Sequence, residues 1–120
     1  MIIQLTDFPK NVVAFVCKGR VTKADYDGVV VPSVQNALQG QDKIRLYYET
    51  DVDFAGLDAG AMWEDFKIGM ESFMRWERIA VVTDVDWIRH AARFFGFLMP
   101  AETKLFSRSQ AAQAREWISA

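Results

Sequence analysis

Strand-like runs of apolar residues alternate with longer stretches of helical periodicity along almost the whole chain, and this alternation restricts the fold more than any other feature. Strands are expected at residues 2–5, 12–17, 43–49, 78–83 and 103–106. Helices are expected at residues 22–38, 58–75 and 87–99, and from Ser107 or Ser109 to Ile118. Strands that alternate with helices form mostly parallel sheets, whereas the short connection between the first two strands favours an antiparallel pair. We therefore predict an α/β fold with a mixed, mostly parallel five-stranded sheet and four helices.

The first predicted helix has a clear start and an irregular middle. Thr22 is expected to cap it, and Asp25 stands at the third position after the cap, as in a capping box. Pro32 lies inside the helix, where its ring clashes with the carbonyl of Gly28. The sequence thus predicts a kink near Val29.

Length and charge narrow the class of protein. A chain of 120 residues fits a single domain over residues 1–120. Its formal net charge of −2 disfavours a general nucleic-acid binder, which normally carries a basic excess. The single cysteine, Cys17, excludes an intramolecular disulfide.

No apolar run approaches the ~20 residues of a membrane span, and the start of the chain lacks the pattern of a signal peptide. A cytoplasmic protein is therefore expected, with peripheral membrane contact as an option.

Residues that could perform catalysis are scarce. His90 is the only histidine and has no partner motif, so we interpret it as a structural or surface residue. Cys17 lies in a strand-like run and is interpreted as a small buried apolar residue. The chain contains no nucleophile elbow, phosphate-binding loop, dinucleotide fingerprint or zinc-ligand spacing. We therefore predict no catalytic residue, no cofactor, no resident metal and a protein that is not an enzyme.

Five aspartates follow the ends of two predicted strands. Asp51, Asp53 and Asp58 come after the third strand, and Asp84 and Asp86 come after the fourth. Carboxylates gathered at one sheet edge could bind Mg²⁺, because this cation prefers oxygen ligands. The simpler interpretation is that Asp58 and Asp86 cap helices and that the other three lie in solvated turns. We favour the simpler one.

Large apolar side chains are in excess on two predicted helices. In the helix at 87–99, a core-facing stripe is expected from Ile88, Ala91, Ala92, Phe95, Leu98 and Met99. Three further residues widen this apolar arc: Trp87, Phe94 and Phe97. The only residues outside the arc are Arg89, His90, Arg93 and Gly96. The helix at 58–75 has a similar stripe of Met62, Phe66, Met70 and Phe73, widened by Trp63 and Met74. A surface helix needs a stripe of only ~100°, so part of this apolar surface is expected to be exposed or to contact a ligand.

The favoured hypothesis is a non-catalytic binding domain for a small apolar or lipid-like ligand, with peripheral membrane association. The residues predicted to contact the ligand or membrane are Trp63, Phe66, Met70, Phe94, Phe97 and Leu98. Secondary candidates are Phe54, Trp87, Arg89 and Arg93. On this hypothesis Phe94 and Phe97 are less buried than Phe95 and Ile88.

Three alternatives stay open. The two helices could bury the excess against each other and the sheet. The same surface could bind a protein partner or a second copy of the chain. A Mg²⁺-dependent enzyme could use Asp51, Asp53 and Asp84.

Several segments, in order along the chain, resemble SpoIIAA-like domains. They are Gly19–Tyr26 with Pro32, Lys43–Tyr47, Asp53–Gly56, Trp63 with Asp65, Glu77–Asp84 with Trp87, Pro100–Glu102 with Phe106, and Ala114–Trp117. The resemblance implies a STAS-related fold that is also likened to CRAL-TRIO lipid-binding domains, in a largely uncharacterised family with suggested roles in apolar ligand binding and membrane association.

The resemblance also implies a relation to the anti-sigma-factor antagonists. These proteins carry a phosphorylatable serine at the start of the helix after the third strand. Residues 53–60 of this chain contain no serine or threonine. The corresponding alternative is therefore a regulatory protein-interaction module of the antagonist type without the phosphorylation switch.

Overall fold

A five-stranded sheet forms the centre of the computed structural model, which describes residues 1–120. Its spatial order is β1-β2-β4-β6-β7. The strands are β1 (Ile2–Leu5), β2 (Val12–Cys17), β4 (Ile44–Thr50), β6 (Trp76–Val82) and β7 (Glu102–Phe106). Strand β1 pairs antiparallel with β2, and every other pairing is parallel. The predicted mixed, mostly parallel sheet is confirmed.

A second sheet of two short parallel strands was not predicted. It joins β3 (Arg20–Val21) to β5 (Gly56–Leu57) beside the carboxyl ends of β2 and β4. Gly56 has a φ of +132°, a backbone conformation that residues with a side chain rarely adopt. A two-residue strand has no periodicity that a sequence pattern could reveal.

Four helical stretches cover the sheet, as predicted. The first consists of α1 (Lys23–Asp25), a π-helical segment (Tyr26–Val30) and α2 (Val31–Gly40), which follow one another without a break. The others are α3 (Ala59–Glu71), α4 (Asp86–Leu98) and the C-terminal stretch, in which a 3₁₀ turn (Arg108–Gln110) leads into α5 (Ala111–Ser119). Helix α3 ends four residues before the predicted Arg75, because the chain turns there to place buried Trp76 in β6.

The π-helical segment coincides with the predicted kink. The N–H of Val31 donates to the carbonyl of Tyr26, five residues back, and Pro32 follows at once in the first turn of α2. A π turn shifts the register of the backbone hydrogen bonds, so it accommodates a residue that lacks an N–H. The hydroxyl of Ser33 donates to the carbonyl of Val29 at 2.7 Å and satisfies one acceptor in this irregular stretch.

The predicted helix caps at Thr22 and Asp58 are confirmed, and Ser107 stands at the N-cap of the 3₁₀ turn that leads into α5. Thr22 and Asp25 form the expected capping box, and Asp58 accepts a hydrogen bond from the N–H of Ala61 at 2.7 Å. Asp86 was predicted to cap α4, but it is the first residue of the helix, and its side chain makes no capping bond. Its carboxylate still lies in the first turn, where negative charge favours the positive end of the helix dipole.

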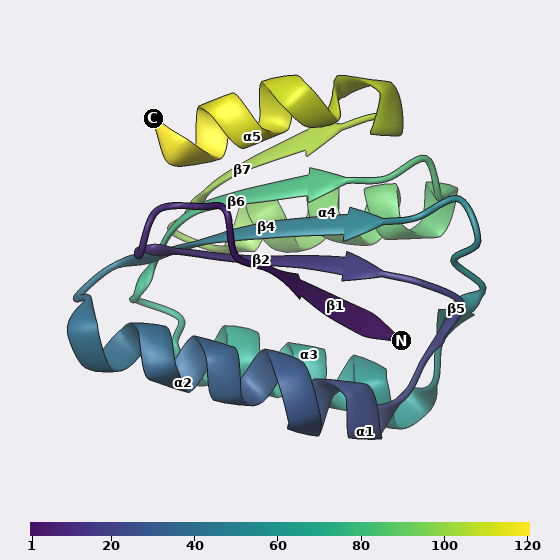
Figure 1. Ribbon diagram of the computed structural model, residues 1–120, viewed down its shortest axis with the longest axis horizontal. Helices are drawn as coiled ribbons and strands as arrows, with labels where there is room; N and C mark the ends of the chain where they lie inside the picture. The colour runs from purple at the N-terminus through teal and green to yellow at the C-terminus, as the bar shows by residue number, and fades with distance from the viewer.

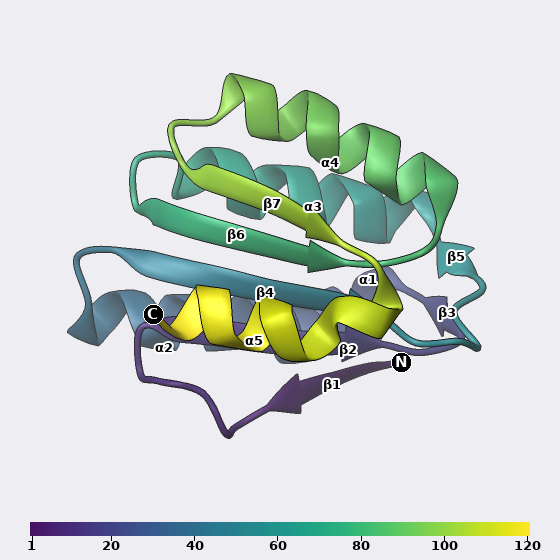
Figure 2. The same ribbon diagram turned by 90° about the horizontal axis from the view of Figure 1, so that it is seen from above.

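The helices form two layers of unequal size around the sheet (Figures 1 and 2). Helices α2, α3 and α4 cover one face, where the larger core lies around Phe15, Tyr26 and Ile44. Helix α5 alone covers the other face, over a smaller core around Tyr47 and Ile118. No helix has both the length and the apolar character to cross a membrane.

Candidate functional site

A row of aromatic rings joins α3 to α4 across the outer surface of the larger layer. Trp63 stacks on Phe66 with ring centroids 5.9 Å apart, and Phe66 meets Phe95 of α4 edge-on at 6.5 Å. Phe95 in turn meets Phe94 edge-on at 5.5 Å. The rings therefore form one continuous patch, and Figure 2 shows the two helices side by side.

The side chains of this patch are largely in contact with water. Phe97 is 90% exposed, Phe94 62% and Trp63 59%. We call the patch the aromatic face and define it by the exposed residues Met62, Trp63, Phe66, Met70, Phe94, Phe95, Phe97 and Leu98. All six residues predicted to contact a ligand lie in it. The ring contacts join Trp63, Phe66 and Phe94, and Phe97 lies beside Phe94 in an open hollow of α4.

The area of the aromatic face reaches the upper end of what a monomer usually exposes in one patch. Its five aromatic side chains average about 60% exposure. Since an aromatic side chain offers about 150–250 Å², they leave roughly 450–750 Å² in water. The largest apolar patch on a typical monomer measures about 300–600 Å². The methionines and Leu98 add to this area, so the face is large enough to bind something.

Phe95 corrects one sequence prediction. It was assigned to the core-facing stripe with Ile88 and Leu98, but Phe95 is 45% exposed and Leu98 is 56% exposed, whereas Ile88 is buried. The side of α4 that meets the sheet includes Gly96 instead, where a Cβ atom would lie 3.0 Å from the Cβ of Thr103 in β7. The helix approaches β7 through a glycine, so Phe95 is turned toward α3. The predicted ranking still holds, because Phe94 and Phe97 are the more exposed.

The anchoring of α3 explains why so much of it is exposed. Only Ala61 and Glu64 of this helix are buried. Near its start, Gly60 packs so closely on α1 that a Cβ atom there would lie 2.9 Å from the Cβ of Lys23. The helix is therefore held against α1 along its inner side, and its outer apolar residues have no layer above them.

A chain of hydrogen bonds ties α3 to the larger core. The hydroxyl of Tyr26 donates to Oδ1 of Asp65 on α3 at 2.9 Å and lies 2.9 Å from the hydroxyl of Tyr48 on β4. Asp65 is exposed on the surface of α3, but the neighbouring residues desolvate its carboxyl group enough to raise its pKa, and the bond from Tyr26 acts in the opposite direction. Burial also raises the pKa of both tyrosines well above its ordinary value. Sequence reasoning missed this chain, because nothing in the spacing of two tyrosines and an aspartate predicts their contact.

The four secondary candidates have different environments. Phe54 is half-buried against the larger core, and Trp87 is exposed in the first turn of α4. Arg89 is half-buried, and its guanidinium donates to the backbone carbonyl oxygens of Thr83 and Phe106. These bonds give it a structural role. Arg93 is exposed on the outer side of α4. Of the two arginines, only Arg93 has a guanidinium that is available to a ligand.

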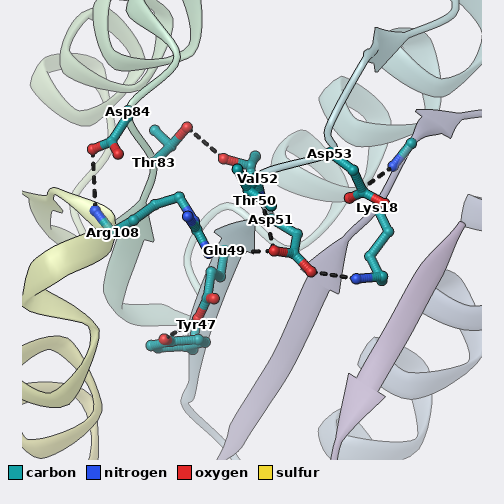
Figure 3. A network of polar contacts seen from close by, with 11 residues as sticks. Lys18, Tyr47, Glu49, Thr50, Asp51, Val52, Asp53, Thr83, Asp84 and Arg108 are labelled. Atoms are coloured by element: carbon teal, nitrogen blue, oxygen red, sulfur yellow. Dashed lines mark hydrogen bonds and ion pairs between the residues drawn. The ribbon is translucent and has the colours of Figure 1, made fainter.

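Asp51 at the carboxyl end of β4 forms ion pairs with two basic residues, and Asp53 and Asp84 accept from backbone N–H groups (Figure 3). Asp51 lies between Lys18, which it contacts closely, and Arg108, whose Nη2 is 3.2 Å from Oδ1. Lys18 is the main cause that lowers the pKa of Asp51. Asp84 accepts from the backbone N–H of Arg108 at 3.1 Å, and Asp53 faces the N–H of Gly19 at 3.4 Å.

This arrangement does not resemble a magnesium site. No three carboxylate, histidine or cysteine residues are grouped closely enough to hold a metal ion. The oxygens of Asp51 already face two cations, and a divalent ion would have to displace them. The hypothesis of a Mg²⁺-dependent enzyme at these residues loses its geometric basis. The hydroxyls of Thr50 and Thr83, which are buried at the carboxyl ends of β4 and β6, form a hydrogen bond of 2.6 Å with each other.

The remaining reactive side chains are also poorly placed for catalysis. Cys17 is fully buried, and desolvation raises the pKa of its thiol to about 12, which disfavours the thiolate. His90 is exposed and lines an open hollow on α4 with Arg93, Phe94 and Phe97. No serine, threonine, cysteine, lysine or carboxylate lies among the residues of this hollow.

The family model for SpoIIAA-like domains matches residues 12–119. The chain belongs to the SpoIIAA-like family. A similar fold is found in the crystal structure, at 2.25 Å resolution, of an uncharacterised protein from the DUF3478 family of Shewanella loihica PV-4, described as having a SpoIIAA-like fold. The two chains are 24% identical, with a TM-score of 0.76 over 98% of this SpoIIAA-like chain and 93% of the other. The sequence matches no curated protein.

These comparisons confirm the SpoIIAA-like resemblance and the fold. They do not bear on the likeness to CRAL-TRIO domains, and at 24% identity the Shewanella protein carries information about the fold alone.

Proposed function

We propose that the domain is a non-catalytic binding module that contacts the apolar zone of a lipid surface through its aromatic face. The observation that carries the proposal is the continuous row of exposed rings from Trp63 on α3 to Phe94 on α4. Exposed apolar patches of this size mark sites of interaction with proteins, ligands or membranes.

The open shape of the aromatic face supports a surface rather than an enclosed ligand. The hollow beside Phe94 and Phe97 opens directly to solvent, and Phe97 is almost fully exposed. Sites for small apolar molecules usually bury most of the ligand in a concave cavity. Protruding aromatic side chains on a helix are typical of helices that lie in the interface of a bilayer.

Phe97→Ser tests the proposal. Because Phe97 is 90% exposed, its replacement should change the free energy of unfolding by no more than about 0.5 kcal/mol. Burying a phenylalanine in an apolar medium contributes about 1.5–3 kcal/mol, so binding to vesicles should weaken roughly tenfold or more. The measurement is co-sedimentation with phosphatidylcholine vesicles, together with circular dichroism to verify the fold.

Val52→Ser is the matched control. Val52 is 82% exposed in the loop after β4 and does not belong to the aromatic face. This variant should bind vesicles like the parent protein. Equal binding by the Phe97→Ser variant and the parent, or no binding by the parent, would refute the proposal.

A second copy of the chain is the competing occupant. A standard protein interface buries about 800 Å² on each partner, and the aromatic face approaches that area. If this alternative holds, the parent forms a dimer in the absence of lipid, and Phe97→Ser makes it monomeric. Light scattering coupled to gel filtration separates this outcome from the lipid-binding one.

A further inference from the structure

The hollow on the outer side of α4 combines basic and aromatic walls, which a purely apolar contact does not require. His90, Arg93, Phe94 and Phe97 line it. Their spacing of i, i+3, i+4 and i+7 places them on one side of the helix. Ile88, the buried residue of α4, lies on the opposite side of the helix, so the hollow points away from the core.

Arg93 is an unpaired cation. It takes part in none of the ion pairs of the structure and in none of its side-chain hydrogen bonds. Arg89, one turn earlier, shows the contrasting case, because its guanidinium is held by two backbone carbonyls. The five donors of the Arg93 guanidinium are therefore available to a ligand.

The partner of this cation is expected to be an anion. No carboxylate lines the hollow, and the imidazole of His90 offers a further hydrogen-bond donor one turn from Arg93. A guanidinium matches the geometry of phosphate oxygens in a bidentate manner. The two most exposed phenylalanines of the chain, Phe94 and Phe97, complete the same hollow. An apolar wall beside a phosphate-binding group is complementary to an amphiphile.

We propose that this hollow binds the phosphate of an anionic phospholipid in a bilayer surface, with Arg93 as the main contact and His90 as a second donor. Phe94 and Phe97 then enter the acyl zone beside the same headgroup. The inference rests on the proposed function and extends it, because it assigns a headgroup preference to the aromatic face.

Arg93→Gln tests the inference against vesicles of two compositions, one of phosphatidylcholine alone and one that also contains phosphatidylglycerol. The parent should bind the anionic vesicles more tightly. One basic residue near an anionic surface contributes about 1 kcal/mol, so the variant should bind them about fivefold more weakly. Its binding to neutral vesicles should not change. Arg93→Lys should restore part of the preference, because it retains the charge.

Arg20→Gln is the matched control, because Arg20 is exposed in β3, away from α4, and forms no ion pair. It should leave both affinities unchanged. Equal binding of the parent to the two kinds of vesicle, or an equal loss in both control and Arg93 variants, would overturn the headgroup assignment and leave the proposed function intact. If the parent bound neither kind of vesicle, both the headgroup assignment and the proposed function would be refuted.

Inorganic phosphate distinguishes a soluble anion from a lipid headgroup. At matched ionic strength, phosphate should not raise the melting temperature of the parent relative to the Arg93→Gln variant. A saturable rise that depends on Arg93, without any preference for anionic vesicles, would identify a site for soluble phosphate and refute the lipid assignment.

Discussion

Removing the hydroxyl of Tyr26 should destabilise the domain more than removing the hydroxyl of Tyr48, although the two rings are similarly buried. The reason is the direction of the hydrogen bonds. Asp65 as a carboxylate can only accept, so the single hydroxyl proton of Tyr26 goes to Asp65. The hydroxyl of Tyr48 must then donate to Tyr26.

The magnitudes follow from what each substitution leaves behind. Tyr26→Phe leaves the buried hydroxyl of Tyr48 without its acceptor, which costs about 1–3 kcal/mol, whereas the exposed Asp65 can accept from water instead. Tyr48→Phe removes one donor and leaves the bond from Tyr26 to Asp65 intact, so it should cost about 1 kcal/mol. The double variant should cost less than the two single variants added together, since no buried hydroxyl is then left without a partner.

Equilibrium unfolding in urea, followed by far-ultraviolet circular dichroism, measures these free energies. The slopes against denaturant should agree among the variants if the native state keeps its compactness. A cost of Tyr48→Phe equal to or above that of Tyr26→Phe would contradict the assigned direction. Strict additivity in the double variant would show that the hydroxyls are not coupled.

The same hydrogen-bond chain predicts a pH dependence. The pKa of Asp65 is raised in the folded protein, so between its ordinary and its folded value the native state binds more protons than the unfolded state. Stability contributed by this group is therefore present at low pH and is lost as pH rises from about 4. Relative to Asp65→Asn, the parent should lose unfolding free energy over that range. A difference that stays constant with pH, or that grows in favour of the parent, would refute the assignment.

Three further predictions concern other parts of the fold. Gly96→Ala should lower the unfolding free energy by about 1 kcal/mol, because a clash of about 1–3 kcal/mol exceeds the gain of about 1 kcal/mol in helix propensity. Gly69→Ala in α3 has open space around the new methyl group and should stabilise instead, and equal thermal shifts in the two variants would contradict the close approach of α4 to the sheet. Millimolar Mg²⁺ should not raise the melting temperature, because cations already pair with Asp51, and a saturable rise that Asp51→Asn abolishes would contradict this. Cys17 should react with iodoacetamide only after unfolding, and rapid alkylation of the native protein would show that its thiol is accessible.

The fold was predictable because its elements are long enough to show a period. The runs at Val12–Cys17 and Ile79–Val82 are apolar on both faces, as expected for central parallel strands, and the structure places both in the interior of the sheet. Helix α4 shows a strong 3.6-residue period over Asp86–Leu98. The pair β3–β5 escaped prediction because two residues carry no periodic signal.

The candidate surface was predictable in composition and not in detail. An excess of apolar residues on two helices could be counted from the sequence, but the rotation of α4 about its axis could not. That rotation depends on the contact of Gly96 with Thr103, and it places Phe95 beside Phe66 instead of in the core. The different environments of Arg89 and Arg93 also depend on tertiary contacts, since both residues lie on the same polar side of the predicted helix.

The position of α5 has a practical consequence for attaching the protein to other molecules. This helix lies on the face of the sheet opposite α3 and α4 (Figure 1). Its last turn is fastened to the sheet, where Arg45 donates to the carbonyl of Ile118 and Arg78 to that of Trp117. A fluorophore, a tether or a fused domain joined after Ala120 would therefore leave from the side away from the aromatic face. Immobilised through that end, the molecule would present α3 and α4 outward in a single orientation, ready for contact with a vesicle flowing past.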